Sequence, residues 1–278
     1  MKQITVTGGK GGTGKSTVAT ALAVLLGKDY KVLLVDADVD CPNDHLLLGI
    51  KRKKVKIVYQ RIPKWDFNKC IKCGKCAEVC KTHAIFVVKG KQPIFLPQQC
   101  NGCGACILSC PVKALSWKKK EIGFVFKGKK HGIDFISGEL KVNEPVSEFV
   151  VNAVKKEIKK VESKYDFVLV DTAAGTHCDV IEALKQTDIA LAVTEPTPLG
   201  EHDLELIIQL IKKLGIKFEI ILNRFEEGKS VLIEAAAKRH GKKIMAKIPY
   251  KKEIMQAYSK GVPVRDNSIE KIKRLVIE

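Results

Sequence analysis

A glycine-rich stretch near the start of the chain has the residue types and spacing needed to bind phosphate. Residues 9–16 read Gly-Lys-Gly-Gly-Thr-Gly-Lys-Ser and fit the pattern G-x-x-x-x-G-K-[ST]. They lie between an expected strand, Lys2–Thr7, and an expected helix, Lys15–Leu26, which is the setting that the pattern requires. Backbone N–H groups and the helix N-terminus would hold the phosphates, Lys15 would reach the β- and γ-phosphates, and Ser16 would bind Mg²⁺. We therefore expect a nucleoside triphosphate to bind here.

The spacing of the cysteines is a second pattern that points to chemistry. Eight of the ten cysteines fall in two runs with the spacing C-x₂-C-x₂-C-x₃-C, namely Cys70, Cys73, Cys76, Cys80 and then Cys100, Cys103, Cys106, Cys110. Three thiolates this close together, with a fourth held apart, suit the corners of a [4Fe–4S] cube, and the duplication is typical of ferredoxins with two clusters. Zinc is the alternative metal, although it usually takes its four ligands as two separated pairs. The clustering differs from a secreted disulfide framework, so we expect a reducing compartment and a cytoplasmic protein.

Positive charge is concentrated around these cysteines. The chain has 49 Lys+Arg and 31 Asp+Glu, a formal net charge of +18, and residues 51–130 alone contribute 20 basic and 3 acidic side chains. Only six of the basic residues are arginine. Because base-specific readers depend on arginine, sequence-specific binding to nucleic acid is not expected. The surplus predicts an acidic partner, while a lysine-rich surface without a partner and nonspecific DNA binding are the alternatives.

The rest of the sequence alternates expected strands and helices. A second strand at residues 31–36 follows the first helix, and from about residue 121 the alternation resumes. This pattern predicts an α/β fold with a doubly wound parallel sheet covered on both faces. Because residues 1–58 alone are too short for such a sheet, we expect one discontinuous domain, residues 1–58 plus 120–278. Residues 59–119 would form a small inserted α+β domain.

The loop and four later motifs together resemble the MinD/ParA/nitrogenase-iron-protein class of P-loop ATPases, whose Walker A motif is deviant. Lys10, directly after the first glycine, matches the extra signature lysine of that class, which contacts the nucleotide across a dimer interface. Asp36-Ala37-Asp38 resembles switch I, and Asp171-Thr172-Ala173-Ala174-Gly175 resembles Walker B and switch II. Asn223-Arg224 resembles the pair that reads adenine, and Ile248-Pro249-Tyr250 resembles the loop that closes over the base. The resemblance covers about 220 of the 278 residues.

The resemblance implies an enzyme that hydrolyses ATP, binds ATP or ADP with Mg²⁺, and closes as a homodimer or as a heterodimer with a paralogue. It implies catalytic roles for Lys10, Lys15 and Asp38, with Asp38 orienting the attacking water. It implies that Ser16, Asp36 and Asp171 hold Mg²⁺. The implied nucleotide-binding residues are Gly9, Lys10, Gly11, Gly12, Thr13, Gly14, Lys15, Ser16, Thr17, Gly175, Asn223, Arg224 and Pro249.

The cysteine region resembles a bacterial-type ferredoxin with two clusters, in which the fourth cysteine of each run binds the other cluster. Carried over, one [4Fe–4S] cluster is held by Cys70, Cys73, Cys76 and Cys110, and the other by Cys80, Cys100, Cys103 and Cys106. Bacterial ferredoxins are usually acidic and this region is basic, so the expected partner is an acidic ferredoxin or flavodoxin. Since the insert leaves the sheet soon after switch I, nucleotide state is predicted to couple ATP to electron transfer. A cluster scaffold or carrier, and a positioning ATPase with a structural ferredoxin, are the alternatives.

Three remaining features receive structural interpretations. Cys41, beside switch I, and Cys178, seven residues after Asp171, are interpreted as small buried residues. The apolar stripe in residues 269–276 predicts a last helix packed on the sheet rather than a membrane anchor. The longest apolar stretch, Val18 to Leu26, is about half of a membrane-spanning helix, and the N-terminus has no apolar segment typical of a secretory signal. No transmembrane segment is expected.

Overall fold

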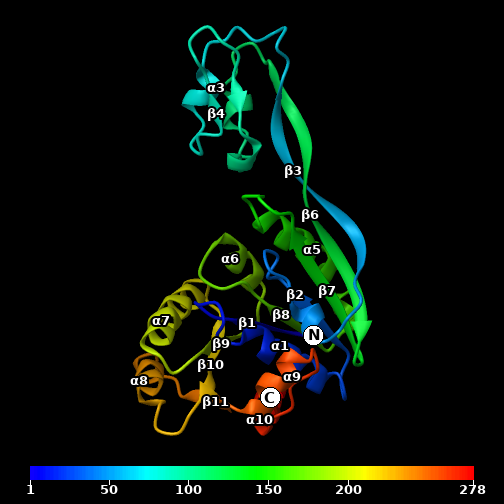
Figure 1. Cartoon of the computed structure of the whole chain (residues 1–278), viewed down its shortest axis with the longest axis vertical. Coiled ribbons are helices and arrows are strands. Elements are labelled where there is room, and N and C mark those ends of the chain that lie inside the picture. The colour runs from blue at the N-terminus through cyan, green and yellow to red at the C-terminus, as the bar shows by residue number, and fades with distance from the viewer.

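The computed structural model describes residues 1–278, and most of the strands join in one nine-stranded sheet (Figure 1). The strands are β1 (Lys2–Thr7), β2 (Val32–Asp36), β3 (Lys53–Trp65), β4 (Ile85–Phe86), β5 (Ile94–Phe95), β6 (Leu115–Lys130), β7 (Ile133–Leu140), β8 (Phe167–Asp171), β9 (Ile189–Thr194), β10 (Lys217–Phe225) and β11 (Ile244–Pro249). The helices are α1 (Lys15–Leu26), α2 (Asp44–Leu47), α3 (Lys75–Glu78), α4 (Ala105–Leu108), α5 (Glu148–Lys159), α6 (Cys178–Leu184), α7 (Pro198–Lys213), α8 (Val231–Arg239), α9 (Lys252–Ser259) and α10 (Asn267–Ile277). Single 3₁₀ turns lie at Pro97–Gln99 and Glu162–Lys164.

The sheet order is β11-β10-β9-β1-β8-β2-β7-β6-β3. The seven strands from β11 to β7 run parallel, which confirms the predicted parallel sheet. The remaining edge differs from the prediction, because β6 runs antiparallel to both β7 and β3. The cause is local: β6 and β7 are joined by only His131 and Gly132, both with positive φ (53° and 78°). A two-residue turn with positive φ at both positions makes a hairpin, whereas parallel neighbours need a crossover.

Helices cover both faces of the parallel strands, as alternation of side chains along β2 illustrates. Leu34 packs in the cluster of buried residues around α1 and α10, whereas Leu33 and Val35 pack in the cluster around α5. A third cluster lies under α7 and α8. The last helix, α10, buries Ile269 and Ile272 against the first of these clusters, so the predicted packed C-terminal helix is confirmed. No helix is both long enough and apolar enough to cross a lipid bilayer.

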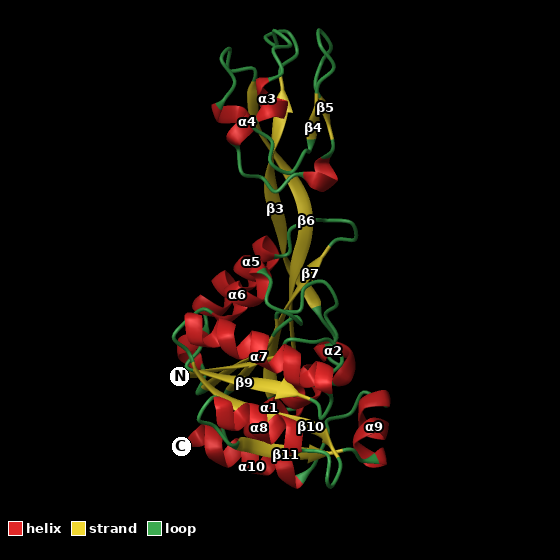
Figure 2. Ribbon diagram, turned by 90° about the vertical axis from the view of Figure 1, so that its left-hand side faces the viewer, coloured by secondary structure: helices red, strands yellow, loops and turns green.

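The strands β3 and β6 extend beyond the rest of the sheet as a two-stranded ribbon. They pair from Lys53 and Lys127 to Trp65 and Leu115, but β7 pairs with β6 only from Gly123 onward. Figures 1 and 2 show this ribbon projecting away from the helices and carrying residues 66–114 at its far end, which we call the cysteine tip. The expected domain boundaries at residues 58 and 120 fall inside β3 and β6, so the ribbon is continuous with the main sheet.

The cysteine tip repeats the same local structure twice. Gly74 and Gly104 have left-handed backbones (φ 82° and 81°) and directly precede the one-turn helices α3 and α4. Further along each repeat, the backbone N–H of His83 donates to the Cys80 carbonyl, and the N–H of Lys113 donates to the Cys110 carbonyl. The duplicated cysteine spacing therefore corresponds to a duplicated backbone.

Candidate functional site

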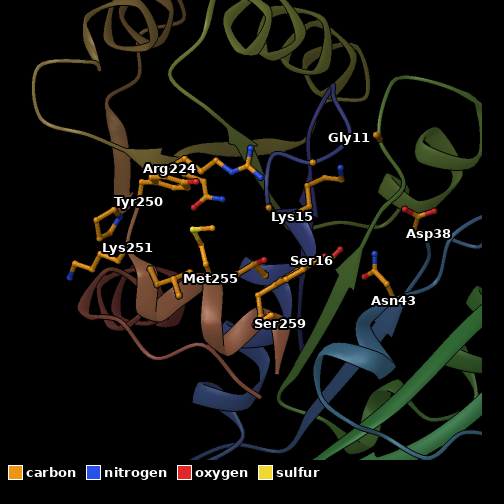
Figure 3. Close-up of a pocket in the computed structure, with 18 residues that line it drawn as sticks. Gly11, Lys15, Ser16, Asp38, Asn43, Arg224, Tyr250, Lys251, Met255 and Ser259 are labelled. Atoms are coloured by element: carbon orange, nitrogen blue, oxygen red, sulfur yellow. The ribbon is translucent and has the colours of Figure 1, made fainter. Parts of the chain in front are cut away.

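The phosphate-binding loop opens into a cavity of about 520 Å³ at the carboxyl ends of the parallel strands. Figure 3 shows Gly11, Lys15 and Ser16 on one side of it and Arg224 and Tyr250 toward the opposite end. Ten of the expected residues line the cavity: Gly11, Gly12, Gly14, Lys15, Ser16, Thr17, Asp38, Asn223, Arg224 and Pro249. The expected residues Gly9, Lys10, Thr13, Asp36, Asp171 and Gly175 are not part of its lining.

The shape of the loop depends on close packing at Gly14. Its φ of 93° is left-handed, and a Cβ there would lie 2.0 Å from Nδ2 of Asn223. The same Nδ2 donates a hydrogen bond of 2.7 Å to the carbonyl oxygen of Thr13, so Asn223 fastens the loop from β10. Only glycine satisfies both the conformation and the space at this position.

Lys15 is almost fully buried, with 7% of its surface exposed. Its Nζ donates to the Lys10 carbonyl at 3.1 Å. Burial lowers the pKa of Lys15, and the carboxylates of Asp171 and Asp38 partly oppose this change. A poorly solvated ammonium group gains more from an anion than an exposed one does, which suits contact with phosphate.

Next to the loop, three carboxyl groups are buried without a salt-bridge partner. Asp36, Asp44 and Asp171 are at most 1% exposed. Asp36 accepts backbone N–H bonds from Asp38 (3.2 Å) and Asp44 (3.1 Å), and Ser16 Oγ donates to Asp171 at 2.6 Å. Both side-chain oxygens of Asp44, and Oδ1 of Asp171, have no hydrogen-bond partner. These orphaned oxygens are the groups that a divalent cation would satisfy.

The electrostatics of this carboxyl cluster agree with its geometry. Burial, and then repulsion by Asp171, raise the pKa of Asp36 and of Asp44 well above the ordinary value. Burial raises the pKa of Asp171 to about 7, although the hydrogen bond from Ser16 and the charge of Lys15 oppose it. Partial burial also raises the pKa of Asp38. Asp44 was not predicted from the sequence, because an aspartate at the start of a helix is ordinarily a first-turn residue.

The expected signature lysine, Lys10, is not among the residues that line the cavity and instead pairs with Glu195. Its Nζ donates to Oε1 of Glu195 at 2.7 Å, and Oε2 of the same carboxylate accepts from Nη1 of Arg224 at 3.0 Å. Burial alone would raise the pKa of Glu195, but these two cations and the Lys10 hydrogen bond leave it lower than usual. Glu195 was missed because a single glutamate after a strand matches no motif.

The far wall of the cavity is built by α9 and the residues before it. Tyr250, Met255 and Tyr258 line it, and each is about half exposed, between 49% and 52%. Lys251, Ile254 and Ser259 complete this wall, and Asn43 and Ala174 also line the cavity. The residues of α9 were not predicted as part of the site, because an eight-residue helix with no buried side chain gives no core signal in a sequence.

Two cysteines near the switch segments were placed wrongly by the sequence interpretation. Cys41 and Cys178 are both exposed rather than buried. Cys41 lies in an irregular segment, and its backbone N–H donates to Oδ1 of Asp38 at 3.2 Å. Cys178 is the first residue of α6, where a side chain points into solvent. The interpretation failed because it relied on the average burial of cysteine, whereas each of these two residues comes before the residues that pack against the core.

In the cysteine tip, the fourth cysteine of each run lies with the triplet of the other run. One pocket is lined by Cys70, Cys73, Cys76 and Cys110, together with Trp65 and Pro93. Cys80 packs against Cys100 and Ile62. Burial raises the pKa of Cys106 to about 11, and Cys100, Cys103, Cys76 and Cys80 add to that increase. Backbone N–H groups of Ala84 and Ala114 donate to the sulfurs of Cys80 and Cys110 at 3.3 and 3.2 Å.

All ten thiols are free of disulfides. No three His, Cys, Asp or Glu side chains converge closely enough to hold a single metal ion.

Comparison with known proteins places the chain among nucleotide-binding proteins. The sequence model of the CobQ/CobB/MinD/ParA nucleotide binding domain matches residues 4–264. An uncharacterized protein of Methanocaldococcus jannaschii is 37% identical over 262 residues, 94% of this chain and 90% of that protein. The septum site-determining protein MinD of Thermotoga maritima is 25% identical over 98% of this chain and 83% of its own length. The fold is similar to that of MinD of Pyrococcus horikoshii in complex with Mg-ADP, with a TM-score of 0.62, 22% identity and coverage of 99% and 95% of the two chains.

Proposed function

Because the chain belongs to the CobQ/CobB/MinD/ParA nucleotide-binding family, we propose that it is a Mg²⁺-dependent ATPase whose nucleotide lies in the cavity beside α1. The observation that carries the proposal is the meeting of two opposite charges at the head of that cavity. The ammonium group of Lys15 is buried and has a lowered pKa. Both side-chain oxygens of Asp44, and Oδ1 of Asp171, are buried without hydrogen-bond partners. An anionic nucleotide bound with Mg²⁺ would neutralise both.

In this proposal each residue of the site has a definite task. Lys15 and the N–H groups of the loop hold the β- and γ-phosphates, and Ser16, Asp36 and Asp171 hold the cation. Asp36 also accepts the backbone N–H of Asp38 and so fixes that segment. The bound Mg²⁺ supplies charge that stabilises the phosphoryl oxygens. Asp38 lines the cavity and would orient the attacking water. Lys10 would contact nucleotide only after leaving Glu195, as in a closed dimer.

A purified protein tests the nucleotide site directly. The wild type is expected to bind Mg-ADP and to release phosphate from ATP, and Lys15→Ala is expected to lose both. The matched control is Lys155→Ala, which removes another partly buried lysine whose Nζ donates to the Glu182 carbonyl at 2.8 Å, outside the cavity. Equal nucleotide affinity in wild type and Lys15→Ala would contradict the proposal.

For the cysteine tip and the adjoining ends of β3 and β6 we propose a ferredoxin-like domain, residues 59–119, with two [4Fe–4S] clusters. The first set of ligands is Cys70, Cys73, Cys76 and Cys110, and the second is Cys80, Cys100, Cys103 and Cys106. The shared pocket around the first set and the crossing of Cys80 and Cys110 between runs support this assignment. Residues 1–58 and 120–278 would form the ATPase domain. Iron and sulfide analysis of anaerobically purified protein tests it, with about eight of each expected per chain.

The two parts suggest an ATPase that couples nucleotide state to electron delivery. The ribbon that carries the tip is hydrogen-bonded through β7 to β2, the strand that ends at Asp36. The basic surface of residues 51–130 would attract an acidic ferredoxin or flavodoxin. Cluster midpoint potentials measured without nucleotide, with ADP and with a non-hydrolysable ATP analogue test the coupling. Potentials and reduction rates that do not change with nucleotide would contradict the coupling. A tenfold preference of ATP for one redox state would shift a one-electron potential by about 59 mV.

A positioning ATPase with a structural cysteine tip is the second candidate. It is favoured by the named relatives, since a MinD protein aligns over almost the whole chain. This function predicts ATP-dependent recruitment to a DNA or membrane surface without any effect of cluster oxidation. Binding to DNA and to vesicles, measured with oxidised and with reduced protein, separates it from the coupled enzyme.

A further inference from the structure

Two cations from distant parts of the chain meet at one buried carboxylate, that of Glu195. Its side chain is 9% exposed and directly follows β9. Oε1 accepts from Nζ of Lys10 at 2.7 Å, and Oε2 accepts from Nη1 of Arg224 at 3.0 Å. The hydroxyl of Thr197 also lies 3.4 Å from Oε1. Each carboxylate oxygen therefore holds a different cation, in hydrogen bonds of the charge-assisted kind.

These cations come from two different segments, the phosphate loop and the end of β10. Lys10 is part of the phosphate loop, and its carbonyl accepts from Nζ of Lys15. Arg224 lines the cavity at the end where Tyr250 lies (Figure 3). Its backbone has a φ of 52°, the left-handed region that arginine rarely adopts. Its side chain is half exposed, so the bond to Glu195 limits the rotamers it can reach.

We propose that Glu195 is a positioning residue that orients Arg224 at the base end of the cavity and neutralises Lys10 in the phosphate loop. The proposal deepens the nucleotide site described above and rests on it. Removing the carboxylate has two opposite consequences. Arg224 loses its fixed orientation, so contact with the base weakens. Lys10 becomes an uncompensated cation beside the phosphates, so binding of the phosphate groups stays equal or strengthens.

A comparison of two probes isolates this effect. Mg-ADP has a base and Mg-pyrophosphate has none, so the ratio of their dissociation constants reports the contribution of the nucleoside. In Glu195→Gln, the ratio of the ADP constant to the pyrophosphate constant is expected to rise about tenfold, which corresponds to about 1.4 kcal/mol. Arg224→Ala is expected to raise the ratio similarly, and the double variant to add little to either single change.

The control is Glu219→Gln. Glu219 also accepts a hydrogen bond from a lysine, Lys242, at 2.6 Å, but it does not line the cavity. The ratio of the two dissociation constants in Glu219→Gln should therefore equal that of the wild type. Far-UV circular dichroism and thermal unfolding of each variant show whether it is folded.

Three results would overturn the proposal. Equal weakening of both probes in Glu195→Gln would mean that the carboxylate only supports the loop. Dissociation constants that are unchanged for both probes would mean that Arg224 needs no positioning. Wild-type protein that binds neither probe would overturn the nucleotide site itself, and the role of Glu195 with it.

Discussion

We predict that the nucleotide-free protein becomes less stable as pH rises toward 8, because the pKa of the Asp171 carboxyl group is raised. This residue is 1% exposed, and burial raises its pKa from 3.8 to about 7. Between these two values the folded state binds more protons than the unfolded state, so the free energy of unfolding falls with increasing pH. For a folded pKa of about 7, the contribution of this group falls by about 1.4 kcal/mol between pH 6 and pH 8. Asp36 and Asp44 shift in the same direction and would add to the decrease.

The assay is urea unfolding at pH 6, 7 and 8 in EDTA, followed by far-UV circular dichroism. Tryptophan fluorescence is unsuitable, because Trp65 and Trp117 both lie on the ribbon next to the cysteine tip. Asp171→Asn should lose about 1.4 kcal/mol of the pH dependence. In buffer without EDTA, Mg-ADP should remove most of the pH dependence of the wild type, because a bound cation favours the ionised carboxylate. A wild-type slope equal to that of Asp171→Asn would refute the reasoning.

Three further changes have expected outcomes. Asn223→Ala removes the hydrogen bond to the Thr13 carbonyl, and we expect Mg-ADP affinity to fall about tenfold, measured by calorimetry; unchanged affinity would show that the loop needs no clamp. Cys110→Ser should eliminate the cluster of the first cysteine run and spare the other, halving the iron content, whereas Cys80→Ser should do the reverse; the two electron paramagnetic resonance spectra should differ, and identical spectra would contradict the crossed assignment. Ile272→Ala opens a cavity at a fully buried position and should cost about 2–5 kcal/mol in unfolding free energy, so a loss below 1 kcal/mol would mean that α10 packs loosely.

The sequence was most informative where one motif combined residue type, spacing and local structure. The loop at residues 9–16 required a strand before it and a helix after it, and both are present as β1 and α1. Most of the parallel strands were predictable because each is rich in apolar and β-branched residues and is separated from the next by a helix. The crossing of Cys80 and Cys110 followed from a resemblance, and the duplicated backbone around Gly74 and Gly104 agrees with it.

The sequence was uninformative where a residue acts through partners far away in the chain. Glu195 and Arg224 are 29 residues apart, and Glu195 and Lys10 are 185 apart, so no local spacing connects them. Asp44 became notable only because its oxygens are buried without partners. The β6–β7 hairpin was not predicted, because alternating strands and helices imply parallel neighbours, whereas the two-residue turn at His131 and Gly132 reverses the chain. Average burial of cysteine gave the wrong environment for Cys178.

The free part of the ribbon can act as a mechanical lever. From Tyr59 to Trp65 strand β3 pairs only with β6, which at that point has no second neighbour. Seven residues of strand span about 23 Å. A tilt of about 10° at the base of such a rod moves its end by about 4 Å, comparable to the spacing between adjacent strands. A change of side-chain size at the base, for example next to Gly123, would therefore displace the cysteine tip much further than it displaces the sheet.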